Sequence, residues 1–310
     1  MAHVTGASSA AKRLVFLDYD QDELDRAYDQ QVWAPNRDAV IKRNALASEA
    51  VRERIGPPST FAYGLTPVET LDVYRTDRLN APVMILLHGG AWRAGRARDY
   101  AFAAEMFVAA GAHHVVPDFG TAMEVGLDGM VAQVRRAVAW VRRQAAAFGA
   151  DPERIYLAGH SSGAHLASNV LVTDWAGEAD LPPDVIKGGL CSSGMYDLEA
   201  VRLSARSSYV TFDDRIEHDY SSQRHLARLG CPVMVSYGDL ESPEFQRQGR
   251  EFADALERIG KLDRRIVGRC YNHFEIIETL ANPYGLLGRA ALDLMCLASP
   301  ARRAPAPPSR

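Results

Sequence analysis

The residues Gly159-His160-Ser161-Ser162-Gly163 form a G-x-S-x-G pattern. The apolar run 155–158 before the pattern predicts a buried strand, and residues 164–171 after it predict a helix. A turn this tight leaves no room for a Cβ beside the serine, which gives both glycines a steric reason. A Gly/Ser-rich turn is the alternative reading of the pattern alone. With its flanking segments, the pattern indicates that Ser161 is a nucleophile aimed at a carbonyl carbon.

A serine hydroxyl is a weak nucleophile at neutral pH, so Ser161 needs a base and an acid that orients the base. After a turn of this kind the chain order is serine, acid, histidine. His273 follows the last predicted strand, and we predict that it is the base. The loop after Tyr237 offers the acid, and we predict Glu241, the third residue after the loop glycine. Asp239 stays open as the alternative, whereas Glu244 is explained better as a first-turn helix residue.

Donors for an oxyanion are expected after the apolar run 82–87, where the chain reads His88-Gly89-Gly90-Ala91-Trp92. Two glycines allow the backbone to approach a substrate closely and to turn its N–H groups inward. The N–H of Ser162 would supply the other side of the hole, and a Gly-rich turn is the alternative interpretation. His160 and His165 lie on the Ser161 turn or its helix, where we expect structural roles.

The elements that position these residues alternate between strands and helices, which predicts an α/β fold with a mainly parallel sheet covered by helices on both faces. Continuously apolar runs indicate strands buried on both faces, whereas residues 69–75 alternate and predict an edge strand. The expected strands are 69–75, 82–87, 113–118, 155–158, 185–190, 232–237 and 265–267, and the expected helices are 21–28, 37–54, 100–110, 125–148, 164–171 and 244–259.

The length of 310 residues and the apolar fraction of 47% suit one domain with additions. We expect residues 1–60 to form a helical extension that contributes to a cap, and residues 61–296 to form the core. The polar stretch 200–227 breaks the alternation and predicts a cap insertion over the sheet edge. The proline-rich tail 297–310 is expected to be disordered.

The charge and the length of the apolar runs argue against nucleic acid and membrane as partners. With 35 basic and 39 acidic residues, the formal charge is −4 and no basic stripe stands out, so we expect no nucleic acid. We expect no membrane either, because no apolar run is long enough and residues 1–14 lack the apolar segment of a secretory signal. A cytoplasmic protein with a small-molecule substrate is the interpretation, with a homodimer left open.

The four cysteines are far apart and show no ligand spacing, so we expect buried free thiols, no metal and no cofactor.

Several motifs, in order, resemble the kynurenine formamidase (arylformamidase) branch of the α/β-hydrolases. Residues 88–92 resemble its HGGxW motif, and residues 159–167 resemble its GHSAGAHLA. The remaining similarities are residues 193–199 to SGxYDLE, 241–248 to D/E-SPEF-x-RQ, and 272–274 to NHF. The resemblance implies a serine hydrolase of aryl-formamides that needs no metal and uses Ser161, Glu241 and His273 as its triad, with oxyanion donors at Gly90, Ala91 and Ser162.

The substrate-binding residues are expected in the same segments. His88, Gly89, Trp92 and Tyr196 are the candidates, and the two large rings could form a flat wall for an aromatic leaving group. Packing at the sheet edge is the alternative for both rings. Residues 119–124 and 202–224 depart from the family pattern, which leaves a carboxylesterase of small aryl or alkyl esters as the second reading. A catalytically silent binding module is the third.

Overall fold

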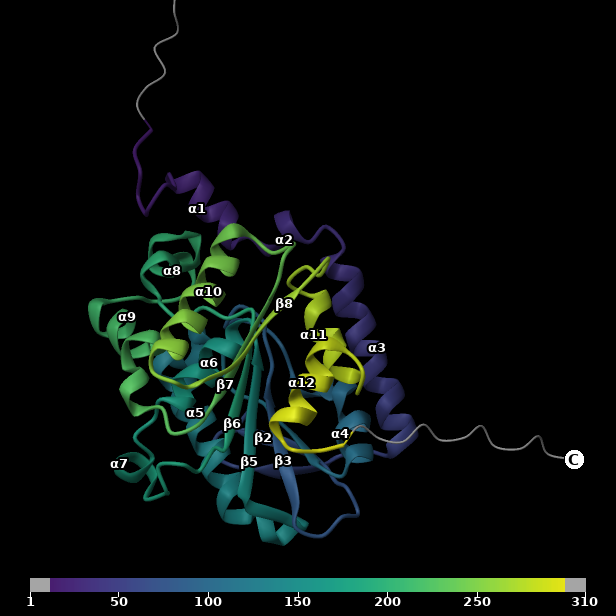
Figure 1. The fold of residues 1–310 in the computed structure, drawn as a ribbon. Helices are drawn as coiled ribbons and strands as arrows, with labels where there is room; N and C mark the ends of the chain where they lie inside the picture. Colours follow the sequence, from purple (N-terminus) through teal and green to yellow (C-terminus); the bar gives the residue numbers. More distant parts are fainter. Residues whose placement is uncertain (1–11, 299–310) are drawn as a thin grey trace, which may run out of the picture.

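A computed structural model describes residues 12–298 and contains one eight-stranded sheet (Figure 1). The strand order is β1-β2-β4-β3-β5-β6-β7-β8. The β1–β2 and β2–β4 pairs are antiparallel and all other pairs are parallel, which confirms the mainly parallel sheet. The strands are β1 (Ser59–Ala62), β2 (Thr70–Tyr74), β3 (Ala81–Leu87), β4 (His113–Pro117), β5 (Ala150–His160), β6 (Gly188–Ser192), β7 (Val233–Gly238) and β8 (Leu262–Gly268).

Helices cover both faces of the sheet (Figure 1). One apolar cluster joins the sheet to α5, α6 and α10, and a second joins the opposite face to α4, α11 and α12. The α-helices are α1 (Gln21–Tyr28), α2 (Gln30–Trp33), α3 (Arg37–Ile55), α4 (Ala104–Ala110), α5 (Ala122–Gln144), α6 (Ser162–Leu171), α7 (Trp175–Ala179), α8 (Glu199–Leu203), α9 (Asp214–Tyr220), α10 (Pro243–Arg258), α11 (Glu275–Glu278) and α12 (Leu286–Leu294); the 3₁₀ helices are η1 (Ala97–Ala103), η2 (Ala145–Phe148), η3 (Ala205–Ser208), η4 (Ser222–Arg228) and η5 (Thr279–Ala281).

The expected strand at 69–75 is present as β2, but the prediction that it forms the sheet edge is wrong. β1 pairs with its outer side, with Ser59 opposite Val73. β1 has only four residues, so its alternation is too short to separate from a loop in the sequence. β6 begins at Gly188 instead of Val185, because the N–H of Val185 closes a turn to the carbonyl of Pro182.

The polar stretch predicted as a cap insertion folds into the short helices α8, η3, α9 and η4. These contact α1, α5, α6 and α10 (Figure 1). α1 packs on α8, η3 and α10, whereas α3 packs on η1. The division into an extension, a core and a cap stays a prediction. Residues 1–11, and residues 299–310 of the predicted disordered tail, lie outside the described residues.

Two further expectations, on the cysteines and on membrane-spanning helices, can be compared with the structure. Cys191 and Cys231 are buried, but Cys270 and Cys296 are exposed, so the prediction of buried thiols is wrong for that pair. Both exposed cysteines lie in turns with positive φ angles after β8 and α12, where the chain is at the surface. Among residues 12–298, no helix has both the length and the apolar character needed to cross a bilayer.

Candidate active site

Ser161 stands in the sharp turn between β5 and α6, with φ 57° and ψ −124°. A non-glycine residue in this region of φ/ψ space costs about 1–3 kcal/mol, so the surroundings must hold it. The Ser161 N–H donates to the carbonyl of Ser192 at 2.9 Å. A Cβ on Gly159 would lie 2.3 Å from the Gly163 carbonyl oxygen, and a Cβ on Gly163 would lie 2.2 Å from that of Leu87. Both glycines are therefore required by contact, as the sequence predicts.

A continuous hydrogen-bonded chain links three side chains that the sequence places far apart. Ser161 Oγ lies 2.8 Å from His273 Nε2, and His273 Nδ1 lies 2.8 Å from Glu241 Oε2. The exposed fractions are 7% for Ser161, 1% for His273 and 2% for Glu241. Because the carboxylate accepts from Nδ1–H, Nε2 carries the lone pair that faces the serine hydroxyl. This arrangement can remove the proton of Ser161.

The structure distinguishes the two carboxylates that the sequence leaves open. Glu241 Oε1 accepts from the N–H of Gly238 and from Ser193 Oγ, each at 2.6 Å, while its other oxygen faces His273. Asp239 Oδ1 instead accepts from the N–H of Cys270 at 2.6 Å and so closes the loop that follows β8. Glu241 is brought to the histidine and Asp239 is not.

Ser193 is a contributor that the sequence reasoning missed. Its hydroxyl donates to the Glu241 carboxylate, and its backbone has φ 54° directly after β6. The sequence marks its segment, residues 193–199, only through a motif. No spacing in the sequence connects it to a carboxylate 48 residues later.

Glu244 has the role expected for the start of α10, with additional partners. The side chain is fully buried and accepts from Tyr28 Oη at 3.0 Å. Arg247 Nε donates to its other oxygen at 2.8 Å. Glu244 therefore joins α1 to α10 next to the site and does not contact His273.

His160 holds the histidine loop in place, in agreement with the structural role expected for it. Its Nε2–H donates to the backbone carbonyl of His273 at 2.7 Å. Burial, together with the nearby His273 ring, lowers the pKa of His160 to about 3, so the ring is neutral. On the other side, the Phe245 ring packs edge-on against His273 with centroids 4.8 Å apart.

The loop after β3 lies directly against the nucleophile. A Cβ on Gly89 would be 3.2 Å from the Ser161 Cβ, and one on Gly90 would be 1.9 Å from the Ala94 carbonyl oxygen. Gly90 has φ 132° and Ala91 has φ 53°, so the chain here is strongly bent. Within residues 12–298, no hydrogen-bond acceptor contacts the backbone N–H of Gly90, Ala91 or Ser162. These N–H groups are free to bind a ligand oxygen.

Trp92 has interior partners that favour the packing alternative. It is 1% exposed, and its Nε1–H donates to His165 Nδ1 at 3.2 Å. The Nε2–H of His165 then donates to the carbonyl of Tyr220 at 3.0 Å, which joins the loop to the end of α9. Burial lowers the pKa of His165 to about 4, consistent with the structural role predicted for it.

The other predicted substrate-binding side chains are also packed inside the protein. Tyr196 is 0% exposed and stacks on Phe252 with ring centroids 3.9 Å apart. His88 stacks on Phe119 at 4.2 Å, and burial lowers its pKa. Direct contact of these side chains, or of Gly89, with a substrate stays a prediction.

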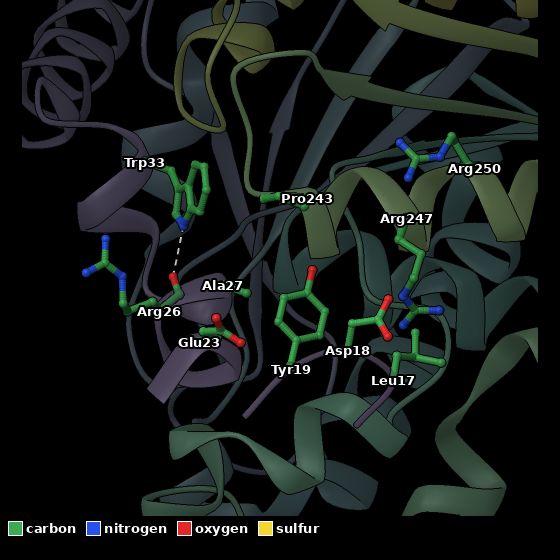
Figure 2. Close-up of a pocket in the computed structure, with 10 residues that line it drawn as sticks. All are labelled: Leu17, Asp18, Tyr19, Glu23, Arg26, Ala27, Trp33, Pro243, Arg247 and Arg250. Carbon is green, nitrogen blue, oxygen red and sulfur yellow. Dashed lines mark hydrogen bonds between the residues drawn. The ribbon is translucent and has the colours of Figure 1, made fainter. Parts of the chain in front are cut away.

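A cavity of about 570 Å³ lies away from the triad, between the N-terminal segment and the start of α10 (Figure 2). Trp33 and Arg247 stand on opposite sides of it with Tyr19 between them, and none of Ser161, Glu241 and His273 lines it. In the described part of the chain, no three His, Cys, Asp or Glu side chains are gathered so that they could hold a metal ion.

The chain is similar in sequence and fold to several known hydrolases. A family model described as BD-FAE matches residues 71–180. The chain is 32% identical to a kynurenine formamidase of Danio rerio over 89% of this chain and 96% of that protein. It is 26% identical to esterase LipC of Mycobacterium tuberculosis over 76% of this chain and 67% of that protein. A crystal structure from Silicibacter sp. tm1040, provisionally called a thioesterase, matches with TM-score 0.76 and 24% identity over 86% of this chain and 97% of that one, which shows a shared fold.

Proposed function

Because this chain belongs to the kynurenine formamidase family of α/β-hydrolases, we propose that it cleaves an N-acyl arylamine, with an N-formyl arylamine such as N-formylkynurenine as its substrate. The observation that carries the proposal is the hydrogen-bonded chain from Ser161 through His273 to Glu241, facing N–H groups without acceptors. Serine hydrolysis needs a nucleophile, a base, an orienting acid and an oxyanion site. The family relationship adds the acyl-arylamine substrate class.

In the proposed mechanism Ser161 Oγ attacks the acyl carbon while His273 Nε2 takes its proton. The Glu241 carboxylate keeps Nδ1 protonated and stabilises the imidazolium that forms. His273 then donates its proton to the leaving arylamine nitrogen, and an acyl-serine remains. Water, deprotonated by the same histidine, releases the acid, which is formate for a formamide.

The negative charge on the carbonyl oxygen would be stabilised by the backbone N–H groups of Gly90, Ala91 and Ser162. Two features support this role: these groups have no acceptor in the described chain, and the Gly89 backbone lies beside Ser161. The N–H of Gly89 itself donates to Tyr100 Oη at 3.1 Å and helps to hold the loop. Burial raises the pKa of that hydroxyl to about 12, so it stays protonated.

The second candidate is a carboxylesterase of small aryl or alkyl esters, favoured by the similarity to esterase LipC. Both reactions pass through similar tetrahedral intermediates, so the triad does not separate them. The test is kcat/KM for N-formylkynurenine beside a short p-nitrophenyl ester. We expect the formamide to be preferred, and a strong preference for the ester would overturn the formamidase proposal.

The third reading, a silent binding module, is tested by a fluorophosphonate probe. We expect the probe to label Ser161, because a serine activated by a histidine attacks phosphorus readily. Absence of labelling would contradict the enzyme proposal.

We also propose that the protein is cytoplasmic. The sequence leaves open a homodimer, and sedimentation velocity would distinguish it from a monomer.

A further inference from the structure

The guanidinium of Arg206, on η3, is buried beside the proposed active site without a carboxylate partner. The residue is 7% exposed. Its Nη1 donates to Tyr209 Oη and its Nη2 to the Tyr28 carbonyl, each at 3.0 Å. Nε is buried and has no acceptor among the described residues. Only two of the five N–H donors of the group therefore have a partner, and both acceptors are neutral.

A charge in this position is costly unless it is compensated. Isolated buried charges are strongly disfavoured, and buried arginines are ordinarily paired with carboxylates. The carboxylate of Asp25 is near in the structure, but it accepts from the N–H of Ala205 and forms no ion pair with Arg206. Arg93 lies against the ring of Tyr209, with its Cζ 4.5 Å from the ring centroid. No described acidic residue forms an ion pair with Arg93 either.

The surroundings of Arg206 lead directly to the proposed catalytic groups. Its Cζ lies 5.6 Å from the ring centroid of Trp92, which follows the predicted oxyanion donors in the chain. On the other side it lies 5.6 Å from the Tyr28 ring, which packs on Phe245, and Phe245 packs on His273. Arg206 therefore contacts the ring that follows the predicted oxyanion donors, and the rings of Tyr28 and Phe245 connect it to His273.

We propose that Arg206 binds a carboxylate of the substrate, so that the enzyme selects acyl arylamines carrying an anionic group. The inference rests on the proposed hydrolase function and adds the residue that would bind the carboxylate of a substrate such as N-formylkynurenine. A guanidinium and a carboxylate match in geometry and form two parallel hydrogen bonds. The free donors of Arg206 suit this pairing, and the bound carboxylate compensates its charge. Arg206 is thus a specificity-determining residue.

The competing explanation is that Arg206 only joins α1, the oxyanion loop and the cap. The test compares N-formylkynurenine with its α-carboxamide, which share the formyl group and the leaving arylamine and differ in the carboxylate. We expect the wild type to prefer the carboxylate by about 10- to 100-fold in kcat/KM, the range of a charge-assisted hydrogen-bond pair. In R206M this ratio falls toward one, and R206K retains part of it.

R215M is the matched control, because Arg215 is an exposed cap arginine whose partner is Asp128. Its substrate ratio is expected to stay at the wild-type value. A proportional loss for both substrates in R206M would indicate a structural role and overturn the inference, as would a wild type without preference.

A measurement on the wild type covers the case in which R206M does not fold. Benzoate should inhibit competitively at a concentration at least about tenfold lower than benzamide. Equal inhibition would contradict the inference.

If the chain cleaves esters and no formamides, the proposed function fails while Arg206 is still tested. The same ratio is then measured with 4-acetoxybenzoate and 4-acetoxybenzamide. A preference for the carboxylate that R206M removes supports the inference, and its absence overturns it.

Discussion

The edge formed by the carboxyl ends of the strands around Ser161 and the helical segment 199–228, which is predicted to be a cap, are held in different ways. At the sheet edge the backbone is bent: Ser161, Ala91, Trp92 and Ser193 have φ angles of 57°, 53°, 59° and 54°. Residues 199–228 contain no glycine and no residue with positive φ. The sheet edge is therefore shaped by backbone conformation, and the cap is shaped by other contacts.

Side chains make those contacts. Arg224 forms a two-pronged ion pair with Asp197, and the N–H of Leu198 donates to Ser221 Oγ. Such contacts tolerate substitution one at a time, whereas a bent backbone in contact on all sides does not. This difference predicts that substitutions at the strand ends around Ser161 strongly affect the catalytic rate. Substitutions in residues 199–228 should instead affect stability and substrate choice.

The largest expected effect comes from removing the nucleophile. S161A should lower kcat by about 10⁴- to 10⁶-fold, because the remaining groups have no nucleophile to activate. The melting temperature should stay close to that of the wild type. The control is S236A, since the buried Ser236 hydroxyl has no partner among the described residues. If S161A kept more than a tenth of the activity, the sheet edge would not be the catalytic region.

The next effect separates the two carboxylates of one loop. E241Q should lower kcat by about 10²- to 10⁴-fold, because an amide N–H facing His273 Nδ1 favours the wrong tautomer. D239N, which leaves the His273 partner intact, should lower kcat by less than about tenfold. Steady-state kinetics of both variants provide the measurement. A larger loss in D239N would reverse the assignment.

Gly90→Ala tests why a glycine is needed after β3. The reason is either the close approach of Gly90 to the Ala94 carbonyl or its positive φ angle alone. The new Cβ would overlap the Ala94 carbonyl, so we expect the free energy of unfolding to fall by about 2–4 kcal/mol and kcat to fall as well. Gly149→Ala is the control: its φ is 85° and nothing lies within 4 Å of its Cβ. That variant should lose about 1 kcal/mol and keep its activity. Urea unfolding of both variants checks the difference, and equal losses would show that contact is irrelevant.

A side-chain contact between α10 and α1, which packs on α8 and η3, should behave in the opposite way. Tyr28→Phe removes the hydroxyl that donates to the buried Glu244, so we expect a loss of about 1–2 kcal/mol in the free energy of unfolding. The kcat should change by less than about threefold. The exposed Tyr284→Phe serves as the control. A loss of activity above tenfold in Y28F would contradict the separation of the two regions.

The smallest effect is a pH dependence that arises on β4, outside both regions. Burial lowers the pKa of His114, on β4, to about 3. Below pH about 6.5 the unfolded chain therefore binds a proton that the folded chain does not, so stability falls as the pH falls toward 3. We expect this histidine to account for a loss of about 1–2 kcal/mol between pH 7 and pH 5. In H114F the melting temperature should depend less on pH, and an unchanged dependence would contradict the assignment.

Much of the fold was predictable because its signals are local. A continuous apolar run identifies β3, since a strand covered on both faces needs no polar residues, and shorter apolar runs mark β4 and β7. The four-residue β1 was not predicted, so β2 was wrongly assigned as the edge strand of the sheet. The short cap helices were also missed, because their polar residues show no clear period.

The sequence by itself determined Ser161, His273 and the loop at 88–92 as candidates, because a glycine pattern or a strand end marks each of them within a few residues. Only the tertiary structure decided between Glu241 and Asp239, since that choice depends on where the loop after β8 passes. It also showed that Arg206 is buried without a carboxylate partner next to Trp92 of the loop after β3. Such relations join segments far apart in the chain, and no local spacing encodes them.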